Sequence, residues 1–207
     1  MSCESGSKTQ RDNDIEPIGF IEAMGNVPGA VAVAAAGLRG SRSGLTVTAW
    51  CCLSITPPTL LVCVNRATKS CEAITAKGTF SLSQLSVSQA ALASEFAGEG
   101  GLVGEEKFTH GSGKWDAFAT GTPALRAAVG SYDCRVVEIY EQHTHCIIVG
   151  RVIEARARNL VKPLVYLQRQ FHQTKAMKQQ ARNENRRYDA RKVGSDNNQN
   201  RCSNRSM

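Results

Sequence analysis

The chain has 207 residues, of which 42% are hydrophobic and 21% are charged, and its formal net charge is +7. This composition is typical of a globular protein with one core of about 150 residues plus extensions. No run approaches the ~18 consecutive apolar residues of a membrane-spanning helix, and the first residues have neither a signal-peptide nor a transit-peptide pattern. We therefore expect a cytoplasmic protein without a membrane anchor.

The excess positive charge lies at the C-terminal end. Residues 174–207 hold nine of the 25 Lys/Arg and three of the 18 Asp/Glu residues. This segment has few large apolar side chains to offset the entropy of ordering, so we expect a disordered basic tail. The alternative, an arm that binds nucleic acid or another anionic surface, is less favoured because the segment has one base-stacking side chain. A second disordered arm is expected at 1–17, which leaves 18–173 as the folded domain.

The eight cysteines have neither a disulfide nor a metal-binding pattern. There is no C-x-x-C, and neither Cys51/Cys52 nor His143/His145 has structural-zinc spacing. Most of the cysteines in apolar, strand-like runs are therefore predicted to be reduced core thiols, and no metal site is expected; they are Cys51, Cys52, Cys63, Cys71, Cys134 and Cys146.

The first half of the domain predicts one helix and three strands. Residues 18–24 predict a short amphipathic helix that ends at Gly25. Small side chains at 30–36 predict a strand, and the Gly/Ser/Arg turn at 37–44 predicts a hairpin into a strand at 45–53. Pro57 and Pro58 end that strand, and 59–64 predicts a fully apolar one.

The second half alternates short helices with strands. Helices are predicted at 70–76 and 88–96, and strands at 79–85, 127–140, 145–153 and 164–171. The glycine-rich segment 97–121, with Phe108 and Trp115 as isolated large side chains, predicts a long surface loop. Many short strands with few helices predict a mainly β fold, a closed or nearly closed antiparallel barrel. No strand is followed by G-x-G-x-x-G, which disfavours a Rossmann dinucleotide site.

Small polar residues gather between Gly44 and Ser70. Period two places Thr46 and Thr48 on one face of a strand and Val47 with Ala49 on the other. Further on, the segment 65–70 brings an arginine, a lysine and hydroxyls to the start of a helix, whose free backbone N–H groups favour anions. One interpretation is a phosphate site; the alternative is that the threonines are only strand formers and the cations are solvated loop charges.

The order and spacing of several motifs resemble the flavin reductase-like family from about residue 20 to residue 171. The motifs are F-x-x-A-M at 20–24, G-L-T-x-T-A at 44–49, P-P-T-L-L-V-C-V-N-R at 57–66, F-A-G at 96–98, H-x-I-I-x-G-x-V at 145–152 and P-L-V-Y at 163–166. The resemblance implies a split β-barrel of the FMN-binding type that forms homodimers and supplies reduced flavin to a partner monooxygenase.

The resemblance also implies which residues bind the flavin. The residues implied to lie along it or to close over it are Thr46, Val47, Thr48, Ala49, Cys52, Ser54, Phe96 and Ala97. Those implied to hold its phosphate end are Asn65, Arg66, Thr68 and Ser70. Cys52 stands where the family commonly has serine, and because a thiol is the weaker hydrogen-bond donor, we expect an altered contact there.

On the nicotinamide side the resemblance implies His145, Tyr166 and Arg169, with His143 as the alternative to His145 on the same strand face. The implied reaction is hydride transfer from a nicotinamide to a flavin, in which the protein supplies positioning and electrostatics, so no catalytic side chain is assigned. The sequence thus predicts an NAD(P)H-dependent reductase that supplies reduced FMN or FAD to an aromatic hydroxylase. Two alternatives are a reductase of another acceptor, such as a metal-corrin, and a flavin-binding protein without reductase activity.

Overall fold

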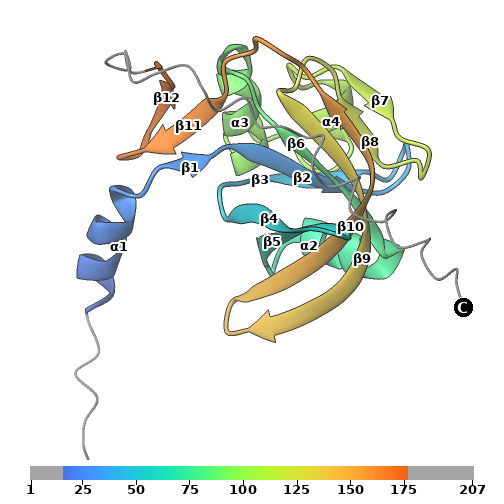
Figure 1. The fold of residues 1–207 in the computed structure, drawn as a ribbon, viewed down its shortest axis with the longest axis horizontal. Helices are drawn as coiled ribbons and strands as arrows, with labels where there is room; N and C mark the ends of the chain where they lie inside the picture. Colours follow the sequence, from blue (N-terminus) through green and yellow to red (C-terminus); the bar gives the residue numbers. More distant parts are fainter. Residues whose placement is uncertain (1–15, 177–207) are drawn as a thin grey trace, which may run out of the picture. The chain divides into compact units, whose positions relative to one another are not determined.

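The computed structural model describes residues 16–176, which form a mainly antiparallel β structure with short helices (Figure 1). The expected arm at 1–17 and the expected basic tail at 174–207 lie outside the described residues, apart from a few positions at their inner ends. Among residues 16–176, no helix has the length and apolar character required to span a bilayer.

A seven-stranded antiparallel sheet forms the barrel. In spatial order its strands are β3 (Ser43–Val47), β2 (Ala32–Ala36), β6 (Thr79–Gln84), β9 (Gly130–Gln142), β10 (His145–Ala157), β5 (Pro58–Asn65) and β4 (Trp50–Ile55). The two edge strands, β3 and β4, follow each other in the chain, and three residue steps span at most about 11 Å. The sheet must therefore curl until its edges approach, which confirms the predicted, nearly closed barrel.

Two smaller sheets and five helical segments complete the domain. The three-stranded sheet contains β1 (Gly29–Ala30), β11 (Leu164–Leu167) and β12 (Gln170–Gln173), and the two-stranded sheet contains β7 (Trp115–Ala117) and β8 (Pro123–Leu125). The helices are α1 (Pro17–Gly25), α2 (Lys69–Lys77), the 3-10 turn η1 (Val87–Gln89), α3 (Ala90–Ala97) and α4 (Glu106–Thr109).

Two predicted strands are divided in the structure. The strand expected at 45–53 ends at Val47, because the chain there passes from one edge of the sheet to the other, and Ala49 accepts a hydrogen bond from the N–H of Cys63 (2.9 Å). Ala49 is consequently exposed and does not share the buried face of Val47. The strand expected at 164–171 is a hairpin, β11 and β12, which turns at 168–169.

β2 separates two parts of the core. All five of its residues are buried, and alternate side chains face opposite sides. Ala32 and Ala34 belong to a buried cluster with Phe80, whereas Val33 belongs to a second cluster with Phe96 of α3. The second cluster fixes α3 against the sheet, and α3 carries part of the candidate site.

The cysteine prediction is confirmed for Cys71, Cys134 and Cys146, which are buried free thiols, and is wrong for Cys51 and Cys52, which are exposed on the edge strand β4. Burial raises the pKa of the Cys134 thiol to about 12, and burial beside Cys146 raises that of Cys71 to about 11. Since the thiolate is the reactive form, neither Cys71 nor Cys134 is a nucleophile at neutral pH.

An ion pair ties the β2–β3 turn to the glycine-rich segment. The Glu105 carboxylate accepts hydrogen bonds from the backbone N–H of Arg42 (2.8 Å) and from its Nε (2.9 Å), and the Arg42 side chain is only 9% exposed. These bonds lower the pKa of Glu105, against a smaller opposing effect of burial. The pair thus anchors a segment that the sequence predicted as a surface loop.

We expect Glu105→Gln to lower the free energy of unfolding by about 2 kcal/mol at neutral pH, because the mostly buried Arg42 loses its counter-charge. A carboxyl group whose pKa is lower in the folded state stabilises the protein above its unfolded pKa, near 4.5, and this stabilisation disappears as the pH falls through the folded pKa.

The difference in Tm between the parent and Glu105→Gln should therefore shrink as the pH is lowered below about 4.5, as followed by thermal unfolding. The control is Glu22→Gln, since the exposed Glu22 side chain makes no ion pair among residues 16–176. A constant difference at all pH values would contradict the assignment to ionised Glu105.

Candidate functional site

A cavity of about 300 Å³ collects six of the predicted site residues from three distant parts of the chain. Thr46, Val47 and Thr48 come from the end of β3 and the residue after it, and Ala97 ends α3. Tyr166 and Arg169 come from the β11–β12 hairpin. Sequence reasoning missed five further lining residues, which are Val31, Ser94, Glu99, Gln170 and Phe171.

α3 is held on β3 by two contacts between predicted motifs. The Thr46 hydroxyl donates a hydrogen bond to the carbonyl oxygen of Ala93 (2.7 Å). Gly44 faces the Phe96 ring so closely that an added Cβ would lie 2.9 Å from the ring. The G-L-T-x-T-A and F-A-G segments therefore meet directly, and the helix can approach because position 44 has no side chain.

Phe96 itself does not line the cavity. Its side chain is 1% exposed and packs against Phe108 (ring centroids 5.1 Å apart) and Trp115 (5.5 Å). The expected position of its ring over a cofactor is therefore not seen, because the ring faces the core side of α3. Ser94 lies three residues before Ala97, so helical spacing could have identified it as a neighbour on the cavity side.

The β11–β12 hairpin reaches the cavity through β1. Tyr166 pairs with Gly29 across the sheet, and a Cβ added at Gly29 would lie 2.8 Å from the Thr48 Cβ. The Tyr166 ring also packs against Phe171 (5.4 Å between centroids), so two aromatic side chains stand together at this wall. Arg169 supplies the one cationic side chain and Glu99 the one anionic side chain among the lining residues.

The turn of this hairpin has an unusual backbone. Gln168 and Arg169 have φ values of 50° and 62°, the left-handed region that glycine and asparagine favour. Two-residue hairpin loops of this kind strongly prefer Asn-Gly, so this chain keeps a bulky cationic residue at a strained position. Strain of this kind is found preferentially at functional positions, and Arg169 faces the cavity.

The predicted phosphate residues form a compact turn outside this cavity. The side chain of Asn65 accepts from the N–H of Ala67 (2.9 Å), and the Thr68 hydroxyl caps α2 by accepting from the N–H of Cys71 (3.2 Å). Ser70 is buried, and its hydroxyl contacts that of Ser43 (3.0 Å). The hydroxyls that sequence reasoning offered to a phosphate are thus engaged within the protein.

Arg66 and His145 lie beside this turn. Arg66 is exposed and pairs with Glu141 (2.8 Å), and His145 is the strand partner of Asn65. The Nδ1 atom of His145 lies 2.8 Å from the Thr144 hydroxyl oxygen. His145 and the segment 65–70 therefore form a second group of predicted residues, and none of them lines the cavity.

The expectation that His143 shares a strand face with His145 is wrong. His143 lies in the β9–β10 turn with a φ of 48°. Side chains alternate between two faces only within a strand, so this alternation does not apply to His143. Its carbonyl oxygen accepts a hydrogen bond from Arg66 (3.3 Å).

Cys52 and Ser54 lie on the exposed edge strand β4. The Cys52 thiol makes a long contact with the carbonyl oxygen of Ser54 (3.7 Å), and the Ser54 hydroxyl oxygen accepts from the N–H of Thr56 (3.1 Å). Both residues belong to the strand that follows Thr48 and Ala49 in the chain, and neither lines the cavity.

Thr46→Val tests the contact that joins β3 to α3. Valine keeps the shape but removes the hydroxyl, so we expect a loss of about 1 kcal/mol in the free energy of unfolding and a several-fold weaker affinity for FMN. Chemical denaturation and fluorescence titration of FMN measure the two effects. The control Thr59→Val removes an exposed hydroxyl that bonds the local carbonyl of Pro57, and it should change neither value measurably. Equal FMN affinity in the parent and Thr46→Val would contradict the prediction.

The sequence and the fold match proteins of known type. A family model described as the flavin reductase like domain matches residues 24–175. The chain is 33% identical over 153 residues to the FMN reductase (NADH) RutF of Ancylobacter novellus, which covers 74% of this chain and 82% of that protein. A protein of Haemophilus somnus 129PT, provisionally named a flavin reductase, superposes with a TM-score of 0.73 at 29% identity over 77% of this chain and all of its own.

The styrene monooxygenase flavin reductase of Pseudomonas putida S12 shares the fold, with a TM-score of 0.67 at 23% identity over 77% of this chain and 99% of that one. The family match spans nearly the whole domain, including β3, the α3 segment and the β11–β12 hairpin that line the cavity. The chain belongs to the flavin reductase-like family.

Proposed function

We propose that this protein is an NAD(P)H-dependent flavin reductase that supplies reduced FMN or FAD to a separate oxygenase. The observation that carries the proposal is the cavity in which the end of β3, the end of α3 and the β11–β12 hairpin meet. Family membership and the FMN reductase (NADH) relative support the same activity.

The cavity lining fits one end of a planar ring system with polar edges. Val47 and Ala97 are small enough to let a flat ring approach. The exposed Thr48 carries a hydroxyl, and the Thr46 hydroxyl, which already donates to Ala93, keeps lone pairs that accept from a ring N–H. A bound flavin supplies the ring that accepts hydride from the nicotinamide.

Most of the other residues predicted to bind flavin lie in two chain segments outside the cavity lining, 49–54 and 65–70. Ala49, just before β4, and Cys52 and Ser54, within β4, are assigned to border the ribityl chain. The phosphate is assigned to the segment from Asn65 to Ser70. Because the Thr68 and Ser70 hydroxyls are engaged internally, Arg66 and the free backbone N–H groups at the start of α2 carry most of this binding.

Tyr166 and Arg169 are assigned to the pyridine nucleotide, with His145 at the far edge of its site. Arg169 offers a cation to the anionic nucleotide, and Tyr166 offers a ring against which the nicotinamide packs. These side chains bind and orient their ligand. No proton transfer by a side chain is required for hydride transfer, so variants here should change KM more than kcat.

The proposed active form is a homodimer. α1 buries none of its residues, and it exposes Ile18, Phe20, Ile21 and Met24 by 48–69%. Leu53 and Ile55 on the edge strand β4 are 53% and 83% exposed. Apolar surfaces of this kind favour a protein partner, and a second copy supplies the same surfaces in return.

Reduced flavin that is released from a reductase needs an acceptor. The proposed acceptor is an oxygenase of the aromatic hydroxylase type. The name of the styrene monooxygenase flavin reductase connects one protein of this fold with a monooxygenase. The proposed location is the cytoplasm, where NAD(P)H is available, and the free cysteines among residues 16–176 support this proposal.

The activity is tested by mixing the purified full chain with NADH or NADPH and free FMN or FAD and following nucleotide oxidation. We expect oxidation that depends on added flavin and release of reduced flavin to the solution. Flavin binding without nucleotide oxidation would show a carrier instead. Reduced flavin that stays bound and passes electrons directly to another acceptor would show a reductase of a different kind.

A further inference from the structure

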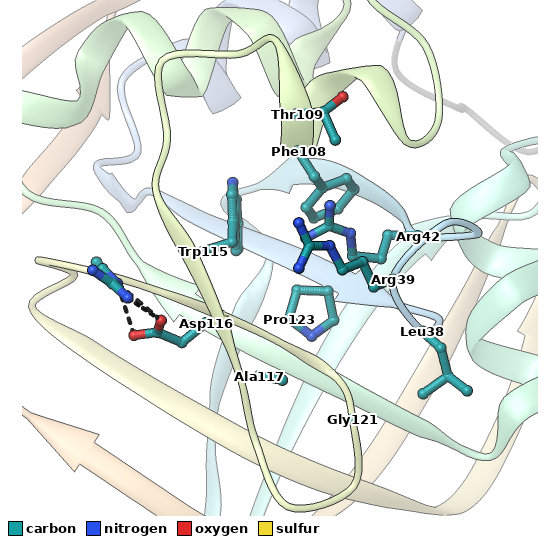
Figure 2. Close-up of a pocket in the computed structure, with 11 residues that line it drawn as sticks. Leu38, Arg39, Arg42, Phe108, Thr109, Trp115, Asp116, Ala117, Gly121 and Pro123 are labelled. Atoms are coloured by element: carbon teal, nitrogen blue, oxygen red, sulfur yellow. Dashed lines mark hydrogen bonds and ion pairs between the residues drawn. The ribbon is translucent and has the colours of Figure 1, made fainter.

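A second, larger cavity of about 920 Å³ lies between the β2–β3 turn and the glycine-rich segment (Figure 2). It shares no lining residue with the cavity described above. α3 stands between them, since Ala97 lines the first cavity while Phe96 packs against Phe108 and Trp115, which line the second. Its volume is that of a small-molecule site, for which ~300–1,000 Å³ is usual.

The charges of this cavity leave one cation unpaired. Arg42 is neutralised by Glu105, and Arg126 is neutralised by Asp116, whose oxygens lie 2.9 Å from the Arg126 Nε. Arg39 makes no ion pair with any of residues 16–176. The lining therefore has one guanidinium available for an anion, beside two arginines already held by carboxylates.

Apart from Thr109, the rest of the lining is aromatic or apolar. Phe108 and Trp115 lie with their ring centroids 4.9 Å apart, and the Arg42 guanidinium lies 4.7 Å over the Phe108 ring. Figure 2 shows the Arg39 and Arg42 side chains extending into the space between Trp115 on one side and Leu38 on the other. A flat ring placed there meets aromatic and guanidinium surfaces, on which such rings stack well.

We infer that this cavity binds a small aromatic monocarboxylate, whose carboxylate pairs with Arg39 and whose ring packs against Trp115. The charge balance selects a single negative charge. A phosphate monoester carries about −1.5 to −2 at neutral pH, which exceeds the one available cation and meets the carboxylates of Asp116 and Glu105 nearby. The site is independent of the proposed reductase activity.

Phenylacetate is the probe, and Trp115 is the reporter. The chain has two tryptophans, so Trp50→Phe leaves Trp115 as the only one. We expect a saturable change in Trp115 fluorescence with phenylacetate, in the presence and in the absence of saturating FMN. Titration calorimetry on the unsubstituted chain gives the same binding constant without relying on the Trp50 substitution. Binding is read directly, so the result stands whether or not flavin reduction is detected.

Arg39→Gln should weaken phenylacetate binding at least tenfold, because a hydrogen bond to a charged group is lost. Arg39 is exposed, so the variant should keep the parent Tm. Arg151→Gln is the matched control, since it removes the same charge from an exposed position of β10 outside this cavity. It should leave phenylacetate binding unchanged.

The neutral isostere phenylacetamide and the nucleotide AMP complete the test. Both should bind at least tenfold more weakly than phenylacetate. Equal binding of phenylacetamide, tighter binding of AMP, competition between phenylacetate and FMN, or equal losses in Arg39→Gln and Arg151→Gln would each overturn the inference.

Discussion

Replacing Arg169 with glycine is expected to stabilise the fold and to impair use of the pyridine nucleotide at the same time. Glycine adopts the observed φ of 62° without strain, so the free energy of unfolding should rise by about 0.5 kcal/mol. The same change removes the only cation of the cavity lining. KM for NADH or NADPH should rise about tenfold or more, with kcat little changed.

Gln168→Gly is the matched control for Arg169→Gly. It relieves similar strain at the neighbouring position, where φ is 50°, and Gln168 does not line the cavity. Within the described part of the chain, the side-chain interaction that it removes is an exposed hydrogen bond from Gln168 to the Asn26 side chain (3.1 Å). We expect unchanged KM and a Tm at or slightly above that of the parent. Thermal unfolding gives the Tm of both variants, and steady-state kinetics give their KM for NADH or NADPH. An unchanged KM in Arg169→Gly would refute the role assigned to Arg169.

Gly44→Ala is expected to cause the largest combined loss of stability and flavin affinity. The added Cβ would lie 2.9 Å from the Phe96 ring and 3.1 Å from the carbonyl oxygen of Ala34, so α3 must move away from β3. Such overpacking should lower the free energy of unfolding by about 2 kcal/mol. Because Ala97 at the end of α3 lines the cavity, affinity for FMN should fall about tenfold, measured by fluorescence titration.

Two further variants separate displacement of α3 from a general effect of alanine. Gly25→Ala adds the same atom where no other group of residues 16–176 lies within 4 Å, and it should leave both measurements unchanged. Phe96→Leu reduces the ring that the new Cβ meets. The double variant Gly44→Ala/Phe96→Leu should cost less than the sum of the single variants. Additive losses would show that Gly44 and Phe96 are not coupled.

Local pattern predicted most elements of this fold because their signals come from neighbouring residues. The helix at 70–76 is observed as α2 (Lys69–Lys77), with Thr68 as its N-cap and Gly78 in the left-handed conformation at its end. The strand at 59–64 is observed within β5 (Pro58–Asn65). Capping side chains, glycines and runs of apolar residues determine such elements wherever they stand in the tertiary fold.

Errors arose where distant segments decide the local structure. Ala49 lies outside the strand because the sheet curls and the N–H of Cys63 donates a hydrogen bond to the carbonyl oxygen of Ala49. Cys51 and Cys52 are exposed because β4 is an edge strand, and an apolar run does not reveal whether its strand is central or peripheral. The hairpin turn at Gln168 and Arg169 contains no glycine or asparagine, so the sequence pattern did not predict a turn there.

The sequence by itself determined a mainly β barrel of the flavin reductase-like type. The order of the motifs and the short strands can be recognised from residues that are close together in the sequence, without knowledge of tertiary contacts. Only the tertiary structure decided which motif residues meet. It joins Thr46, Ala97 and Arg169 at one cavity, and it leaves His145 beside Asn65 outside that cavity. It also places Arg39 and Trp115 together in the lining of a second cavity. The physical reason is that side chains far apart in sequence become neighbours only through strand pairing and core packing.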